Sequence, residues 1–164
     1  MDKPKYTTIR TRVMDILRNH DQESRVIEAQ IAAERESLEY DLEELLLEGA
    51  YPSTAINPTG VRASSPDHDG KLIRMVEKRD RRRTRADEVI QSLECQLLQI
   101  EEVYSLILQL DARSKSVLLT LYYPYRSYDE AAEILQIDRT TVYRQRKIAL
   151  NKLFARAELS KTFN

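Results

Sequence analysis

The chain has 164 residues, enough for one ordinary domain or for a small domain with a helical extension. Charged residues make up 32% of it, and the hydrophobic content of 41% is slightly below the globular average. No apolar run approaches the roughly 20 residues of a membrane span, and residues 1–6 lack the apolar core of a signal peptide. The single cysteine, Cys95, excludes a disulfide framework and a Cys-based zinc site, so we expect a cytoplasmic protein without membrane contact.

The formal net charge is only −1, but the charges are unevenly distributed along the chain. Residues 21–48 hold ten acidic residues and two arginines, and residues 71–85 hold eight basic and two acidic residues. Residues 139–156 hold six basic residues and no acidic one. Such asymmetry indicates segments that interact with one another or with a polyanion.

The first part of the chain, residues 1–48, predicts an acidic pair of helices. Apolar residues at three- and four-residue steps predict a first helix that ends near His20 and Asp21. A longer helix over about residues 23–48 carries an apolar seam, with acidic residues on its other faces. Residues 49–70 hold all three glycines and three of the five prolines, which predicts a linker because both residue types disfavour helix interiors. The apolar positions are Tyr6, Ile9, Val13, Ile16 and Leu17 in the first helix, and Ile27, Ile31, Leu38, Leu42 and Leu45 in the second.

Residues 71–110 predict the longest helix, which at about 1.5 Å per residue would reach roughly 60 Å. A basic run at residues 78–85 lies in its first half, and a coiled-coil-like seam of apolar residues follows. Extending the register backwards puts Arg79 and Arg83 at seam positions, so the tight seam should end near Ala86. The seam residues are Ile90, Leu93, Leu97, Ile100, Tyr104 and Ile107.

Two features of this helix leave alternatives open. The seam at residues 90–107 pairs either with a second copy, giving a homodimer, or with the helix that contains Ile31 and Leu45. The basic run precedes the seam as a basic region precedes a leucine zipper, but the asparagine and alanine pattern of such regions is missing. A solvated face, or an ionic partner for acidic residues 21–48, is therefore favoured over a second DNA contact.

The remaining residues, 111–158, predict a small C-terminal domain that contains a helix-turn-helix motif. A capping box at Ser127 and Glu130 starts the middle helix, and Asp138 is a favourable N-cap for the last one. Small inward-facing residues let these helices cross closely, so that the last helix projects from the body and fits a major groove. The helices span about residues 113–123, 128–135 and 139–154, and the predicted fold class is all-α, with an extended helical N-terminal part leading into the small domain.

The outward face of the last helix is suited to double-stranded DNA. Arginine can form two hydrogen bonds with the edge of guanine, while threonine and tyrosine can reach phosphates or the thymine methyl group. Amides at the starts of both helices offer further phosphate contacts. This interpretation requires the side chains to project away from the protein's own body. The candidate DNA-binding residues are Arg139, Thr140, Thr141, Tyr143, Arg144 and Lys147, with Ser127 and Tyr128 at the preceding helix.

Several segments of this part resemble region four of bacterial sigma factors, the module that reads the upstream promoter element. They are LLTLYY at residues 118–123, SYDEAAEILQI at 127–137, TVYR at 141–144 and ALNKL at 149–153. The layout, with an acidic helical N-terminus and a long helix, is similar to that of the RinA/ArpU-type phage transcriptional regulators. The resemblance implies base and phosphate contacts by Arg139, Thr140, Tyr143, Arg144 and Lys147.

Two residues depart from the region-four pattern. Gln136 stands where the turn commonly has glycine, so the turn must adopt a strained or alternative geometry. Arg146 stands where an apolar residue often packs, which predicts a looser inner face or a side chain that reaches outward. The chain also has no tryptophan and offers no aromatic surface for unstacked bases, so we expect it to bind duplex DNA without melting it.

Together these features predict a sequence-specific DNA-binding transcriptional regulator of phage or prophage type in the cytoplasm of a bacterial host. Double-stranded DNA is the expected partner, and RNA polymerase is a second candidate. The alternatives are a DNA-packaging protein similar to a phage terminase small subunit and a helical adaptor that binds no DNA. Neither an enzyme nor a cofactor or metal is expected, because the sequence offers no catalytic constellation, phosphate-binding glycine loop or metal-ligand cluster.

Overall fold

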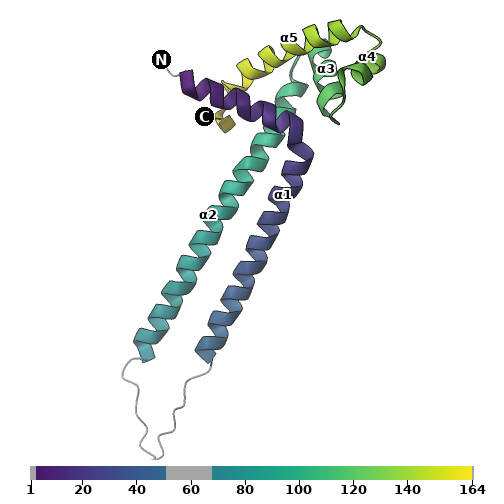
Figure 1. The fold of residues 1–164 in the computed structure, drawn as a ribbon. Coiled ribbons are helices and arrows are strands. Elements are labelled where there is room, and N and C mark those ends of the chain that lie inside the picture. Colours follow the sequence, from purple (N-terminus) through teal and green to yellow (C-terminus); the bar gives the residue numbers. More distant parts are fainter. Residues whose placement is uncertain (1–2, 51–67, 164) are drawn as a thin grey trace, which may run out of the picture. The chain divides into compact units, whose positions relative to one another are not determined.

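The computed structural model describes residues 3–50 and 68–163, which form α-helices and one short 3₁₀-helix (Figure 1). Within these residues the one β-type pairing is an isolated bridge between Tyr122, at the end of α3, and Tyr125. The predicted all-α fold is therefore confirmed. The elements are α1 (Lys3–Ala50), α2 (His68–Leu108), α3 (Ala112–Tyr122), α4 (Tyr128–Leu135), α5 (Arg139–Ala157) and the 3₁₀-helix Lys161–Phe163.

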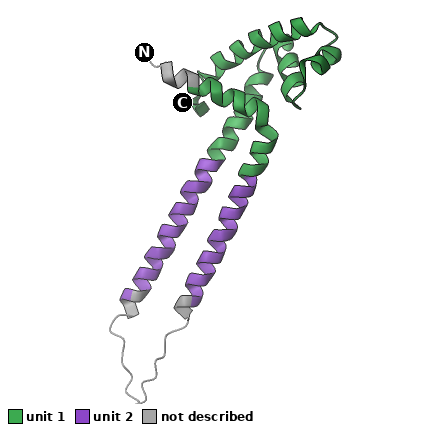
Figure 2. Ribbon diagram, viewed as in Figure 1, with its two compact units in different colours: residues 1–27, 94–164 green, residues 28–93 purple. Residues whose placement is uncertain are grey.

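The chain divides into two compact units (Figure 2). Unit 1 consists of Met1–Ile27 and Glu94–Asn164, and unit 2 consists of Glu28–Leu93. Each of the long helices α1 and α2 therefore contributes one part to each unit. The N-terminal part of α1 belongs with the C-terminal helices, a grouping that neighbourhood in sequence does not suggest.

Helix α1 runs without interruption from Lys3 to Ala50, so the predicted end near His20 and Asp21 is absent. Neither residue breaks a helix by its backbone chemistry. The His20 side chain is mostly covered, and its ring centroid lies 4.0 Å from that of Tyr123, so packing within unit 1 favours an unbroken helix here. The helices also reach into both ends of the predicted linker at 49–70, and residues 51–67 lie outside the described residues.

Apolar side chains from all five α-helices form the core of unit 1. The predicted apolar face of the N-terminal segment is confirmed for Ile9 and for three residues one and two turns further on, which are buried, while the Tyr6 side chain lies outside those described. Unit 1 buries the C-terminal end of the predicted seam. The seam residue Tyr104 and the nearby Leu98 remain exposed. A dimer through residues 90–107 therefore stays a prediction. Fully buried core residues include Val13, Ile16, Leu17, Val103, Ile107, Leu118 and Leu153.

In unit 2 the two long helices lie side by side and are joined by ion pairs (Figure 1). The Arg82 guanidinium donates from Nη1 to Glu34 Oε1 at 2.8 Å and from Nε to Asp41 Oδ2 at 2.5 Å. Pairing between the basic run and the acidic helix is thus confirmed for Arg82. The register differs from the predicted one: Arg82 lies between the helices, whereas Arg83 is exposed. The helices also remain in contact beyond the fully buried Ala86, where the seam was expected to end.

Candidate nucleic-acid interface

Helix α4 begins where the sequence predicts, because its capping box forms. The Ser127 hydroxyl accepts from the Glu130 amide at 3.3 Å, and the Ser127 amide donates to Glu130 Oε2 at 2.8 Å. These hydrogen bonds lower the pKa of Glu130, first through the Ser127 backbone and then through its hydroxyl. Two amides at the start of α4 are therefore satisfied within the chain, and the Glu130 carboxylate stays ionised near neutral pH.

The turn between α4 and α5 has the strained geometry expected of a glycine position occupied by another residue. Gln136 adopts a left-handed conformation with φ 54° and ψ 42°. Its amide and that of Ile137 donate to carbonyl groups in the last turn of α4, the second one to Ala132 at 3.1 Å. Reversing the chain direction in so few residues requires a positive φ, and Gln136 adopts it despite its Cβ.

Asp138 occupies the N-cap position of α5 with an extended backbone, as predicted, but its carboxylate makes no capping hydrogen bond. The backbone carbonyl of Asp138 accepts from Val142 at 2.9 Å, which starts the helix. The predicted side-chain cap is therefore absent. Amides of the first turn of α5 remain available to an external acceptor.

The inner face of α5 packs as predicted. Val142, Ala149 and Leu153 are fully buried, and so is Ala131 on α4, which lets the helices approach closely. A polar contact ties the far end of α5 to α3, because Lys152 Nζ donates to Asp111 Oδ1 at 2.5 Å and to Ser114 Oγ at 3.3 Å. Asp111 also caps α3 by accepting from the Ser114 amide at 3.1 Å. Lys152, and then Ser114, hold the pKa of the Asp111 carboxyl well below its ordinary value.

Arg146 neither loosens the inner face nor reaches into solvent, in contrast to both expectations. Its Nε donates to the Tyr122 hydroxyl at 2.8 Å, and its guanidinium lies 5.8 Å from the ring centroids of both Tyr122 and Tyr128. A cation between two aromatic rings thus replaces the apolar residue, linking α3, α4 and α5. Burial raises the pKa of the Tyr122 hydroxyl, and Arg146 opposes part of that rise. The sequence offers one signal for this arrangement, the tyrosines Tyr122 and Tyr128, but their contact with Arg146 was not predicted from the sequence.

The outward face of α5 projects from the body, as the DNA-binding interpretation requires. Arg139 and Arg144 are exposed, and Tyr143 has 59% of its surface open to solvent. Among the candidates on α5, Thr141 alone is half-buried. Arg139 lies 3.4 Å from the exposed Asp129 carboxylate of α4, a surface ion pair of at most about 1 kcal/mol that an approaching phosphate can replace.

The six basic residues of α5 fall into two groups. Four have partners within the chain: Arg139 forms an ion pair with Asp129, and hydrogen bonds run from Arg146 to Tyr122, from Lys152 to Asp111 and from Arg156 to Gln109. Arg144 and Lys147 are exposed and form no ion pair within the part of the chain that the structure describes. They lie three residues apart on one face of the helix, so they are the cations best placed to meet a polyanion.

The two candidates at α4 are engaged within the protein. The Ser127 hydroxyl donates its proton to Glu130 Oε2 at 2.9 Å, so it can donate to a phosphate only if the capping box opens. Tyr128 is half-buried, with its ring 6.0 Å from that of Tyr143 and beside the Arg146 guanidinium. The structure therefore brings Tyr128 together with Tyr143, and leaves Ser127 in a capping role.

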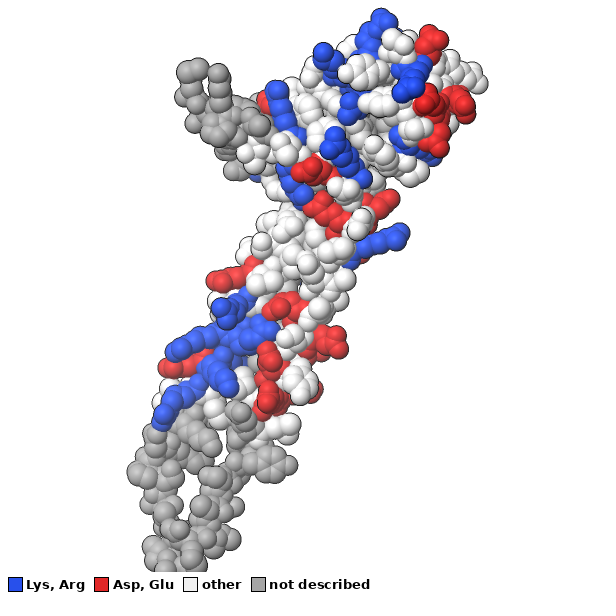
Figure 3. Space-filling model, viewed as in Figure 1, with Lys and Arg blue, Asp and Glu red and all other residues white. Residues whose placement is uncertain are grey.

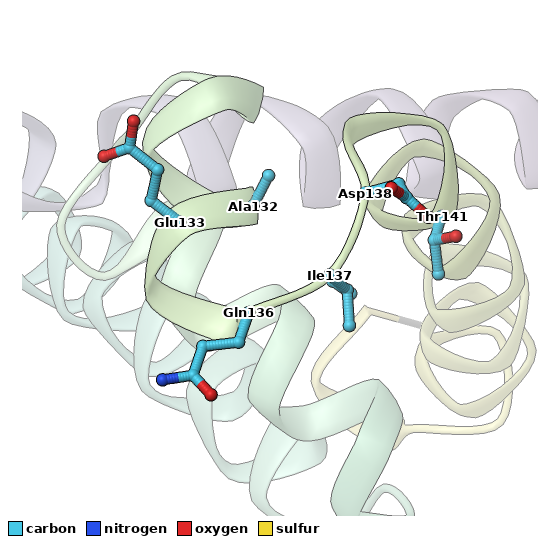
Figure 4. A pocket seen from close by; sticks show the side chains of 6 residues that line it. All are labelled: Ala132, Glu133, Gln136, Ile137, Asp138 and Thr141. Atoms are coloured by element: carbon cyan, nitrogen blue, oxygen red, sulfur yellow. The ribbon is translucent and has the colours of Figure 1, made fainter.

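An open depression of about 480 Å³ lies at the connection between α4 and α5 (Figure 4). Figure 4 shows Ala132 and Thr141 on opposite sides of it, with Ile137 on the connection between the helices. Its lining also includes Glu133 and Asp138, and these carboxylates repel a nucleic-acid backbone. We therefore expect a nucleic acid to contact the Arg144 and Lys147 side of α5 instead of this depression.

Helix α4, a short turn and α5 thus follow one another closely, and α5 carries no acidic residue and has an exposed basic face. No protein family, curated protein or solved structure matches the chain. Among the described helices, none combines the length and the apolar character that crossing a membrane requires. Nor do the described residues include three or more acidic, histidine or cysteine side chains grouped so that they could hold a metal ion.

Proposed function

We propose that this protein binds double-stranded DNA through α5 and regulates transcription, as a regulator of phage or prophage type. The phage assignment rests on the resemblance to sigma region four and to the RinA/ArpU-type layout. The DNA assignment rests on the chemistry of α5, which carries basic and hydroxyl side chains outward and small apolar ones inward. This division of faces is the one a groove-reading helix needs.

The observation that carries the proposal is the exposed pair Arg144 and Lys147, whose charges find no partner among the described residues. Arg144 lies beside the exposed Tyr143, and Thr140 is one turn before it on the same face. An arginine in this position can read guanine, while the lysine and hydroxyl groups can fix the helix against phosphates. We assign base recognition to Arg144 and backbone contact to Lys147.

Selection from a random duplex library, followed by binding titrations on the selected site, tests the proposal. Arg144→Ala should weaken binding by about 1–3 kcal/mol and reduce base preference at one position. Lys147→Ala should weaken binding to all sequences alike and lower the slope of log affinity against log salt by about 1. The matched control is Arg25→Ala, an exposed arginine of α1 whose removal should leave site preference and affinity unchanged.

The same titrations separate the proposal from its alternatives. A helical adaptor would show no salt-dependent DNA binding, whereas neutralisation of phosphates makes affinity fall steeply with salt. A packaging protein would bind DNA as a ring of many subunits, which its mass in solution would reveal. Unchanged affinity and preference in Arg144→Ala would show that α5 is not the recognition helix.

A further inference from the structure

The end of unit 2 where α1 ends and α2 begins carries large apolar side chains that no described residue covers. Leu46 is 67% exposed on α1, and Leu72 and Ile73 are 55% and 58% exposed on α2. A groove of about 330 Å³ between the helices is lined by residues that include Leu42, Leu46, Leu72, Met75 and Val76. A contiguous apolar surface of this kind on a soluble chain marks an interaction site.

The two helices that border this surface carry opposite charges (Figure 3). Residues 28–47 of α1 hold seven acidic residues and one arginine, while residues 72–85 of α2 hold seven basic and two acidic residues. The Glu34 and Asp41 carboxylates are already bonded to Arg82. Exposed charges that form no ion pair within the described residues remain on both helices: Glu39, Glu43 and Glu44 on α1, and Lys78, Arg83 and Arg85 on α2.

Unit 2 by itself buries little apolar surface. Its fully or nearly buried apolar residues among those described are Ile31, Leu45 and Ala86, and the ion-paired Arg82 lies between the helices at an interior position. Two paired helices with so small a core are only marginally stable in water, because helices in proteins gain most of their stability from packing an apolar face. The surface therefore needs a partner that supplies both apolar contacts and complementary charge.

We propose that unit 2 binds unit 2 of a second copy of this chain, so that the two hairpins form a four-helix bundle around the exposed leucines and isoleucine. Two-fold packing of two hairpins can place α1 beside either α1 or α2 of the partner. The first arrangement sets acidic helix against acidic helix and basic against basic. The second sets each acidic α1 between two basic helices, and the charges therefore select it.

This interface differs from a dimer through residues 90–107, and it does not depend on DNA binding. The proposed interface lies at the end of unit 2 that carries the exposed Leu46 and Ile73 side chains. Those left open between residues 90 and 107 include Leu98, which is 55% exposed and belongs to unit 1. Single substitutions can therefore separate the two surfaces.

Sedimentation of the full chain over a range of concentrations tests the proposal. We expect the wild type to have twice the 19.2 kDa mass of one chain, and Leu46→Asp or Ile73→Asp to raise the dimer dissociation constant by at least about tenfold. Each variant should keep its helical circular dichroism, because the replaced side chains are exposed in the single chain. The matched control Leu98→Asp should remain dimeric. A monomeric wild type, or a dimer broken by Leu98→Asp and not by Leu46→Asp, would overturn the proposal.

A charge exchange tests which helices meet. One variant carries Lys78→Glu, Arg83→Glu and Arg85→Glu, and the other carries Glu39→Lys, Glu43→Lys and Glu44→Lys. In the proposed bundle each variant alone repels itself and dissociates, whereas an equal mixture forms a heterodimer of wild-type strength. If neither variant dissociates alone, α1 does not lie beside α2 of the partner and the proposed arrangement is wrong.

Discussion

Units 1 and 2 are both built from helices, but different interactions hold them together. In unit 1, buried apolar side chains from five helices, Leu118 and Leu153 among them, form the core, and polar contacts such as Lys152 with Asp111 lie near the surface. In unit 2, an ion-paired Arg82 occupies the position between two helices, and several leucines remain in solvent. Most buried apolar residues thus stabilise unit 1, whereas unit 2 keeps apolar side chains exposed and available for association.

The largest expected difference between the units comes from truncating a buried leucine in each. Leu118→Ala should lower the free energy of unfolding of unit 1 by about 2–5 kcal/mol, because Leu118 is fully enclosed and its neighbours cannot collapse into the cavity. Leu45→Ala should cost less, since Leu45 borders open grooves on unit 2. Hydrogen exchange followed by peptide at fixed protein concentration measures both effects. An equal loss of unfolding free energy in Leu118→Ala and Leu45→Ala would contradict this difference between the units.

The next largest effect concerns the charge between the helices of unit 2. Arg82→Leu should destabilise the pairing by about 1 kcal/mol, because it leaves Glu34 and Asp41 close together without a cation. Replacing all three residues by leucine should restore or exceed wild-type protection, since an apolar contact carries no desolvation cost. Faster exchange confined to residues 28–93 in the single variant is the expected readout. Loss of protection in unit 1 as well would show that the units are coupled.

A smaller effect, of the opposite sign, is expected at the turn of unit 1. Gln136→Gly should raise the stability of unit 1 by about 0.5–1 kcal/mol, because glycine adopts a positive φ without the Cβ clash. The matched control is Gln145→Gly, inside α5, which should lower stability by about 1 kcal/mol. Thermal unfolding of both variants gives the comparison. Destabilisation by both would show that Gln136 is not strained.

The smallest effect is the pH dependence that Asp111 contributes to unit 1. The pKa of its carboxyl is lowered by Lys152 and Ser114, so the contribution is complete above its ordinary value of 3.8 and is lost as the pH falls below it. Asp111→Asn keeps a capping side chain but removes the charge. Its stability should therefore fall less between pH 5 and pH 2 than that of the wild type. An identical acid dependence would exclude this carboxylate as a source.

Local sequence signals predicted much of the C-terminal part, because its elements are fixed by neighbours in sequence. The capping box set the start of α4 at Tyr128, and Asp138 marked the start of α5, although its carboxylate makes no capping hydrogen bond. The all-α fold and the burial of Val142, Ala149 and Leu153 followed from periodicity. The conformation of Gln136 followed from its place in a turn that normally needs glycine.

Interactions between distant residues were beyond these signals. The His20 ring packs against Tyr123, which lies about a hundred residues away in the sequence, and the Arg146 guanidinium is held by a hydrogen bond to Tyr122. The register of unit 2 depends on which arginine meets Glu34 and Asp41, and adjacent arginines in a basic run cannot be told apart by composition. Long-range packing, rather than propensity, decides such cases.

Tyr128 contacts both the concealed and the outward side of α5. Its ring lies beside the Arg146 guanidinium on one side and 6.0 Å from the Tyr143 ring on the other. On the proposed function, a substitution at this half-buried position would change DNA recognition indirectly, by altering how α5 packs and where the Tyr143 ring lies. Variants would then gain a new target sequence without any change in the side chains proposed to touch it.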